Sequence, residues 1–278
     1  MEHDKHIFWL SSYLKSGNTW FRIFLANLLH SSNEALELNQ VDSIIHDEIT
    51  TSRLWVDRAC GFNTALLTEN ELDSIKPRVY GWHGREQQKV SYHKTHQAYI
   101  YTDNNEPLVP SEGCLGAIHF VRNPLDVAVS LANHCLFSLD DAINMMGDET
   151  HVLRHFFVHQ PLLSWSMHVK SWWEAKDLDV LLLRYEDMVL DTHASFTKAT
   201  QFLGLDVTQS MIEKAISHAS FNKLKAFEIQ HGFIEKPPRV KSFFRKGMIG
   251  DWKKELSHEQ VQRIIKDHGE MMQVFGYL

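Results

Sequence analysis

A short polar turn between two apolar segments has the clearest chemistry in this sequence. Residues 7–10 are apolar and rich in β-forming side chains, which predicts a buried strand. Residues 20–29 are apolar on all sides, which predicts a core helix. The turn between them points backbone N–H groups and the positive end of a helix dipole at one place, as an anion-binding site does. Its residues are Lys15, Ser16, Gly17, Asn18 and Thr19, followed by Trp20.

This turn differs from a Walker A loop. In that loop the lysine follows the second glycine and precedes Ser or Thr. Here Lys15 comes two residues before Gly17, the only glycine of the turn. The structural alternative is an ordinary strand–turn–helix corner with a solvated lysine.

A second candidate phosphate-binding residue is Arg122. It directly follows a predicted strand, residues 117–121. It precedes Asn123 and Pro124, which predict the start of a helix. Ser130 lies about two turns farther on, near the same face. An arginine at a helix start binds phosphate through its planar guanidinium and neighbouring main-chain donors. The alternative is a structural arginine that pairs with a carboxylate.

A third basic segment lies near the C-terminus. Arg245 and Lys246 precede Gly247, within a stretch of glycines and aromatic residues that covers 243–253. Adjacent cations between such residues suit a loop that folds over a charged ligand. The alternative is a solvated basic loop.

Together the three segments resemble those of the cytosolic-type sulfotransferases, which use 3′-phosphoadenosine 5′-phosphosulfate (PAPS) and release 3′-phosphoadenosine 5′-phosphate (PAP). The resemblance covers nearly the whole chain. It implies that the first segment holds the 5′-phosphosulfate, and that the second and third hold the 3′-phosphate. The first segment departs from the family pattern at Leu14, where the family has proline, and at Asn18, where it has threonine. Asn18 keeps a side-chain donor, so we expect anion binding to persist.

The same resemblance assigns further site residues. Lys94-Thr95-His96 matches the segment with the family's catalytic histidine. His96 has the pKa range of a general base, and Lys15 can stabilise charge on the leaving oxygen. Lys94, two residues before His96 on an extended segment, would face the same side as a second cation.

The adenine and its surroundings have three aromatic candidates. Trp20 and Phe221 are expected to enclose the purine by stacking, and Tyr185 follows the predicted strand 180–183. Ala219 stands where the family often has threonine, so one purine contact is expected to be missing.

The order of the elements predicts an α/β fold. Strand-like runs at 7–10, 117–121 and 180–183 alternate with helical segments, which indicates a mostly parallel sheet flanked by helices. We expect one sulfotransferase domain over 1–278, with a P-loop-like nucleotide-binding core. Residues 31–112, with loops at 80–85 and 103–107, are expected to shape the acceptor site. Residues 233–253 are expected to form a loop that closes over the cofactor.

The composition of the chain restricts which classes of protein and of binding site are expected. The net charge of −7 over 278 residues argues against nucleic-acid binding. Three cysteines without paired spacing predict reduced thiols in the cytoplasm. No apolar run reaches the ~18 residues of a membrane span, and the N-terminus lacks a signal-peptide pattern. None of the 18 histidines has metal-site spacing, so no metal is expected.

The predicted reaction is transfer of a sulfuryl group to a hydroxyl or amine of a small molecule. One alternative is a nucleotide kinase, which the missing Walker A loop opposes. Another is a PAP-binding protein without catalysis, which Lys15 and His96 oppose. The acceptor is not identified.

Aromatic residues could line an acceptor pocket or belong to the core. They are Trp82, and Phe156, Phe157, Trp165 and Trp172 on a helix predicted over 152–173. The family's dimer segment is poorly matched after Lys253, so the oligomeric state stays open.

Overall fold

The computed structural model describes residues 5–30, 32–45, 52–154 and 158–278. Within them the chain forms two units, each built from three separate segments. The first unit comprises Met1–Tyr13, His46–His119 and Glu149–Leu182. The second comprises Leu14–Ile45, Phe120–Asp148 and Leu183–Leu278.

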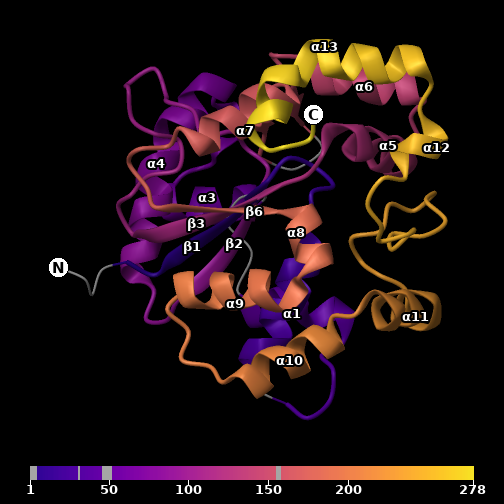
Figure 1. Ribbon diagram of the computed structural model, residues 1–278. Helices are drawn as coiled ribbons and strands as arrows, with labels where there is room; N and C mark the ends of the chain where they lie inside the picture. The colour runs from indigo at the N-terminus through magenta and orange to yellow at the C-terminus, as the bar shows by residue number, and fades with distance from the viewer. Residues whose placement is uncertain (1–4, 31, 46–51, 155–157) are drawn as a thin grey trace. The chain divides into compact units, whose positions relative to one another are not determined.

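A four-stranded sheet is the centre of the first unit (Figure 1). Its strand order is β2-β1-β3-β6. The strands are β1 (Ile7–Ser12), β2 (Ser91–Thr95), β3 (Cys114–Val121) and β6 (Val180–Arg184). β1 and β2 run parallel, with a register from Ile7↔Ser91 to Ser11↔Thr95. All six residues of β1 are buried, as expected for a strand inside a parallel sheet.

Helices of the first unit share a core with this sheet. The unit contains α3 (Arg53–Cys60), η3 (Thr64–Leu66), α4 (Glu69–Glu86), β4 (Val152–Leu153), β5 (Gln160–Pro161) and α7 (Trp165–Trp173). Trp9 of β1, Tyr80 of α4 and Trp172 of α7 belong to one buried cluster. The predicted α/β architecture with a parallel sheet is therefore confirmed.

Among the described residues, most elements of the second unit are helices, and only the last residues of β3 and β6 add strand to it. It contains α1 (Asn18–His30), η2 (Leu38–Gln40), α2 (Val41–Ile45), α5 (Pro124–Cys135), α6 (Leu139–Gly147), α8 (Tyr185–Leu190), α9 (Thr192–Phe202), α10 (Gln209–His218), α11 (Phe221–His231), α12 (Trp252–Glu255) and α13 (His258–Val274). Phe21 and Phe24 of α1 pack against Phe196 of α9, with ring centroids 5.5 and 4.3 Å away. The start predicted for α5 is confirmed, because the Asn123 side chain accepts from the Leu125 amide and Pro124 occupies the first turn.

One predicted loop is wrong. Residues 80–85 belong to the long helix α4, which opens with a capping box between Thr68 and Glu71. Glycines suggested a turn there, but their role is close packing. A Cβ on Gly84 would lie 2.1 Å from the Gly113 carbonyl oxygen. The second predicted loop, at 103–107, is confirmed as turns closed by a bridge between Tyr101 and Pro107.

The helix predicted over 152–173 is also wrong. Val152 and Leu153 pair antiparallel with Pro161 and Gln160. Pro161 has no N–H to donate and disfavours helical backbone before it, so a helix begins only after the cap at Ser164. The stretch that contains the two phenylalanines at 156 and 157 lies outside the described residues.

Candidate functional site

The turn after β1 belongs to the second unit and has a tightly curled backbone. Lys15 has φ +65° and Gly17 has φ +101°. A Cβ on Gly17 would lie 2.8 Å from the Tyr185 ring, so glycine is required on two counts. Because α1 begins at Asn18, the first amides of that helix directly follow the curl. The geometry supplies the main-chain donors that an anion-binding turn needs.

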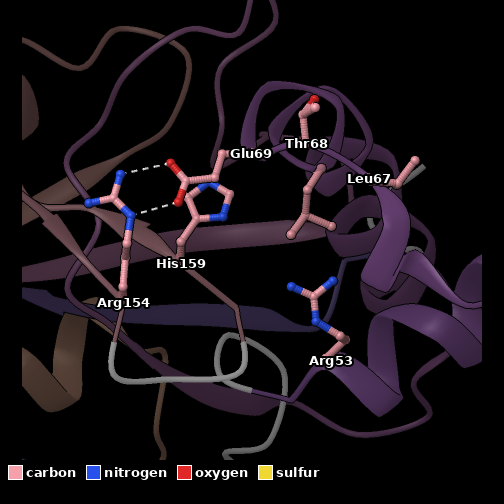
Figure 2. A pocket seen from close by; sticks show the side chains of 7 residues that line it. Arg53, Leu67, Thr68, Glu69, Arg154 and His159 are labelled. Atoms are coloured by element: carbon pink, nitrogen blue, oxygen red, sulfur yellow. Dashed lines mark hydrogen bonds and ion pairs between the residues drawn. The ribbon is translucent and has the colours of Figure 1, made fainter.

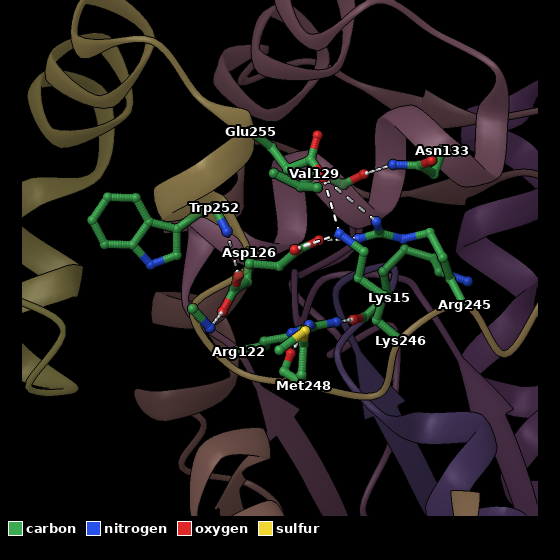
Figure 3. A network of polar contacts seen from close by, with 12 residues as sticks. Lys15, Arg122, Asp126, Val129, Asn133, Arg245, Lys246, Met248, Trp252 and Glu255 are labelled. Carbon is green, nitrogen blue, oxygen red and sulfur yellow. Dashed lines mark hydrogen bonds and ion pairs between the residues drawn. The ribbon is translucent and has the colours of Figure 1, made fainter. Parts of the chain in front are cut away.

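Arg122 joins the three basic segments (Figure 3). Its Nη1 donates to the Lys15 carbonyl at 3.0 Å, and its Nη2 donates to the Met248 carbonyl at 3.3 Å. Its guanidinium carbon lies 4.2 Å from the centroid of the Tyr185 ring, within cation–π range. One side chain therefore contacts the first turn, the strand-end tyrosine and the third segment.

The third segment is tied to α5 and to its own acidic residues. Asp126 accepts from the amides of Gly250 and Trp252, at 2.7 and 3.1 Å. Arg245 donates to Asp251 at 2.5 Å and Lys246 donates to the same carboxylate at 2.6 Å. These contacts define the loop conformation in which both cations are presented.

The ion pairs of this loop shift the pKa values of Asp251 and Lys246. Burial alone would raise the pKa of Asp251, but hydrogen bonds from Lys246 and Arg245 outweigh it and lower that pKa. The Asp251 and Glu255 carboxylates raise the pKa of Lys246. Asp251 and Lys246 are therefore both charged at neutral pH.

Aromatic residues lie beside the same segments in the second unit. Trp20 donates through Nε1 to the Ala219 carbonyl at 3.0 Å, and its ring lies 6.1 Å from that of Tyr185. Phe221 opens α11, and a Cβ on Gly247 would lie 2.4 Å from its ring. The third segment thus passes directly over Phe221.

The other predicted residues of the second unit are also placed. Ser16 and Asn18 are almost fully buried. Thr19 Oγ1 lies 3.4 Å from the Glu235 carboxylate. Ser130 is half-buried in α5.

Sequence reasoning missed His134 and Phe243. Lys15 Nζ lies 3.2 Å from His134 Nδ1 and 4.2 Å from the centroid of the Phe243 ring. The signal that could have found His134 is its position four residues after Ser130 on α5, since residues four apart share a helix face.

His96 and Lys94 belong to the first unit. His96 follows β2, and its Nδ1 lies 2.8 Å from the Ser12 carbonyl oxygen. Its amide donates to Gln160 Oε1 at 2.8 Å. A carbonyl only accepts, so Nδ1 carries the hydrogen and Nε2 has the lone pair that accepts a proton. Lys94 is half-buried in β2, opposite Leu10 of β1.

The first unit also contains a pocket of about 180 Å³ (Figure 2). Its lining residues are Arg53, Leu67, Thr68, Glu69, Leu72, Arg154 and His159. Arg154 binds Glu69 with two hydrogen bonds of 2.7 and 2.9 Å. His159 Nε2 lies 3.0 Å from Asp73, and its carbonyl accepts from the buried Lys76 at 2.9 Å. The lining is mostly polar and charged.

Two of the three tryptophans considered for an acceptor pocket are buried, and one is exposed. Trp165 and Trp172 are fully buried and belong to the core. Trp82, on α4, is 41% exposed. In the described residues no group of three or more His, Cys, Asp or Glu is arranged to hold a metal ion. Over the same residues no helix has the length and apolarity needed to cross a membrane.

Comparison with known proteins identifies the protein family to which the chain is similar. The family model described as "Sulfotransferase domain" matches residues 5–276. Sulfotransferase 1 family member D1 of Rattus norvegicus is 27% identical over 273 residues, which cover 95% of this chain and 82% of the relative. Sulfotransferase 1E1 of Rattus norvegicus is 32% identical over 163 residues, which cover 54% of this chain and 55% of the relative.

Solved structures share the fold. Mouse sulfotransferase SULT7A1 complexed with PAP has a TM-score of 0.60 and 24% identity, over 96% of this chain and 84% of that one. Retinol dehydratase in complex with androsterone and inactive cofactor PAP has a TM-score of 0.62 and 19% identity, over 96% and 80%.

Proposed function

Because the chain belongs to the sulfotransferase domain family, we propose that it transfers a sulfuryl group from PAPS to a hydroxyl or amine of a small molecule. The observation that carries this proposal is Arg122, whose guanidinium contacts the Lys15 turn, Tyr185 and the Met248 segment together. Two proteins of the same fold are described as complexes with PAP, which supports the choice of nucleotide. We also propose that both units form one domain, since one family model spans them.

The residues present fit a doubly phosphorylated nucleotide. Ser16 Oγ and Arg122 Nε are buried polar atoms without a hydrogen-bond partner in the described part of the chain. Such atoms are costly to bury unless a ligand or water satisfies them. Gly17 and Gly247 leave no room for a Cβ beside Tyr185 and Phe221, so main chain and aromatic rings approach closely.

Each part of the nucleotide has its proposed residues. For the 5′-phosphosulfate they are Lys15, Ser16, Gly17, Asn18 and Thr19. For the 3′-phosphate they are Arg122, Ser130, Arg245, Lys246 and Gly247. For the adenosine they are Trp20, Tyr185 and Phe221. When bound, PAPS supplies an activated sulfuryl group.

We assign the proton transfer to His96. The Ser12 carbonyl holds Nδ1–H, so Nε2 is the atom that accepts the proton from the acceptor hydroxyl or amine. The Gln160 side chain accepts a hydrogen bond from the His96 amide and so positions His96 directly after β2. Lys15 and the amides of its turn stabilise the negative charge that develops on the leaving oxygen. Lys94 adds a second positive charge.

The pocket of the first unit supports the proposal that residues 31–112 shape the acceptor site. Five of its seven lining residues come from that region. The other side is formed by Arg154 and His159, and His159 is the neighbour of Gln160, which holds the His96 amide. A small-molecule acceptor at this pocket would meet a charged lining.

A cytoplasmic location is proposed from the cysteines. Cys60, Cys114 and Cys135 all lie in the described residues and are free thiols. Such thiols persist in a reducing compartment.

Calorimetry with PAP beside ATP and Mg²⁺ tests the nucleotide, and transfer of labelled sulfate to a panel of alcohols, phenols and amines tests the reaction. We expect tight binding of PAP, weak binding of ATP, and transfer that persists in EDTA. Phosphoryl transfer from ATP that requires Mg²⁺ would instead indicate the kinase. PAP binding without transfer to any acceptor would indicate the binding protein.

A further inference from the structure

The cations of the third segment have a second carboxylate beside them. Glu255, the last residue of α12, accepts from Lys246 Nζ at 3.0 Å and lies 4.0 Å from Arg245 Nη1. Figure 3 shows Glu255 beside Lys246 and Arg245. Two cations proposed for one phosphate group thus share a carboxylate from the neighbouring helix.

The two acidic residues of this cluster differ in environment. The Asp251 side chain is 5% exposed, and the backbone on both sides of it is held by Asp126. The Glu255 side chain is 40% exposed and contacts Lys246 Nζ. A long, exposed carboxylate can rotate into water at little cost, because surface ion pairs are weak. Asp251 is therefore a fixed part of the loop, whereas Glu255 is exchangeable.

We propose that Glu255 competes with the 3′-phosphate of a nucleoside 3′,5′-bisphosphate for Lys246 and Arg245, and so weakens nucleotide binding and favours product release. This inference rests on the proposed function, since it concerns the same nucleotide site. A phosphate dianion that approaches these cations must displace Glu255 or remain near a like charge. Either event lowers affinity for the 3′-phosphate and leaves contacts with the 5′-group unchanged.

The test compares two nucleotides on two variants. Glu255→Gln keeps the side-chain length and removes the charge. PAP carries the 3′-phosphate and AMP lacks it. The control is Glu259→Gln, which removes the same charge four residues farther on, where the carboxylate accepts from Ser257 rather than from the loop cations. Dissociation constants are measured by calorimetry at low and high salt.

We expect Glu255→Gln to bind PAP about three- to tenfold more tightly, as estimated from the strength of exposed ion pairs and of like-charge repulsion in water. The gain should shrink at high salt because exposed charges are screened. AMP binding to this variant, and PAP binding to Glu259→Gln, should stay within about 1.5-fold of wild type by the same reasoning.

Other outcomes would refute either the competition alone or the proposed function as well. Unchanged PAP affinity in Glu255→Gln, or an equal gain for AMP, refutes the competition while the proposed function stands. Failure of the unaltered protein to bind PAP refutes the proposed function and the competition together.

Discussion

Asp126 is the residue through which α5 holds the third basic segment. Its buried carboxylate accepts from the Gly250 amide through one oxygen and from the Trp252 amide through the other. The substitution Asp126→Asn keeps the shape of the side chain but converts one oxygen to an NH₂ group. That group can only donate, so one of the two amides loses its acceptor.

The size of the effect follows from this single lost contact. A hydrogen bond to a charged group contributes about 1.5–3 kcal/mol, and a buried amide left unsatisfied costs a similar amount. A loss of about 2 kcal/mol lowers the ratio of docked to undocked loop about 30-fold. Because Arg245 and Lys246 are proposed to bind only from the docked loop, we expect PAP affinity to fall by up to about thirtyfold, the full amount where the undocked loop already predominates before the nucleotide binds.

Calorimetry with PAP and AMP provides the assay. AMP lacks the 3′-phosphate, so its affinity should change less than about twofold. The matched control is Asp141→Asn, which removes an exposed carboxylate from the first turn of α6 and should leave PAP binding unchanged. PAP affinity within twofold of wild type in Asp126→Asn, despite lower thermal stability, would refute the view that this anchor governs the loop.

Three further predictions concern the catalytic residues and stability. His96→Ala should lower turnover about 10²- to 10⁴-fold with PAP affinity nearly unchanged in calorimetry; normal rates of labelled sulfate transfer would remove His96 as the base. Lys15→Ala should lose turnover and also some PAP affinity in the same two assays, and unchanged values of both would contradict its role. Burial lowers the pKa of His168 to about 4, so below pH ~6.5 the unfolded chain binds a proton that the native one does not. The His168 contribution to stability is the difference between wild type and His168→Gln in urea unfolding. It should fall between pH 6.5 and 4 by up to about 3 kcal/mol and level off below pH 4; equal losses in both proteins would exclude His168 as the cause.

Local sequence signals predicted the elements that carry the proposed nucleotide site. The apolar run before Lys15 and the Asn123-Pro124 pair at the start of α5 depend on neighbours a few residues away, and both predictions are confirmed. The prediction from sequence was wrong where the role of a residue depends on a contact with a distant part of the chain. The glycine at 84 looked like a turn because nothing nearby shows that α4 packs against the backbone of Gly113.

The sequence predicted which residue types and spacings would bind phosphate, because a cation, a glycine and a helix start within one short segment can form an anion site by local geometry. It could not show that Arg122 reaches the carbonyls of Lys15 and Met248, which lie 107 and 126 positions away. Nor could it show that Glu255 faces the loop cations, or that Ser12 holds Nδ1 of His96. Those contacts depend on how elements pack, and packing is set by the folded chain as a whole rather than by any short segment.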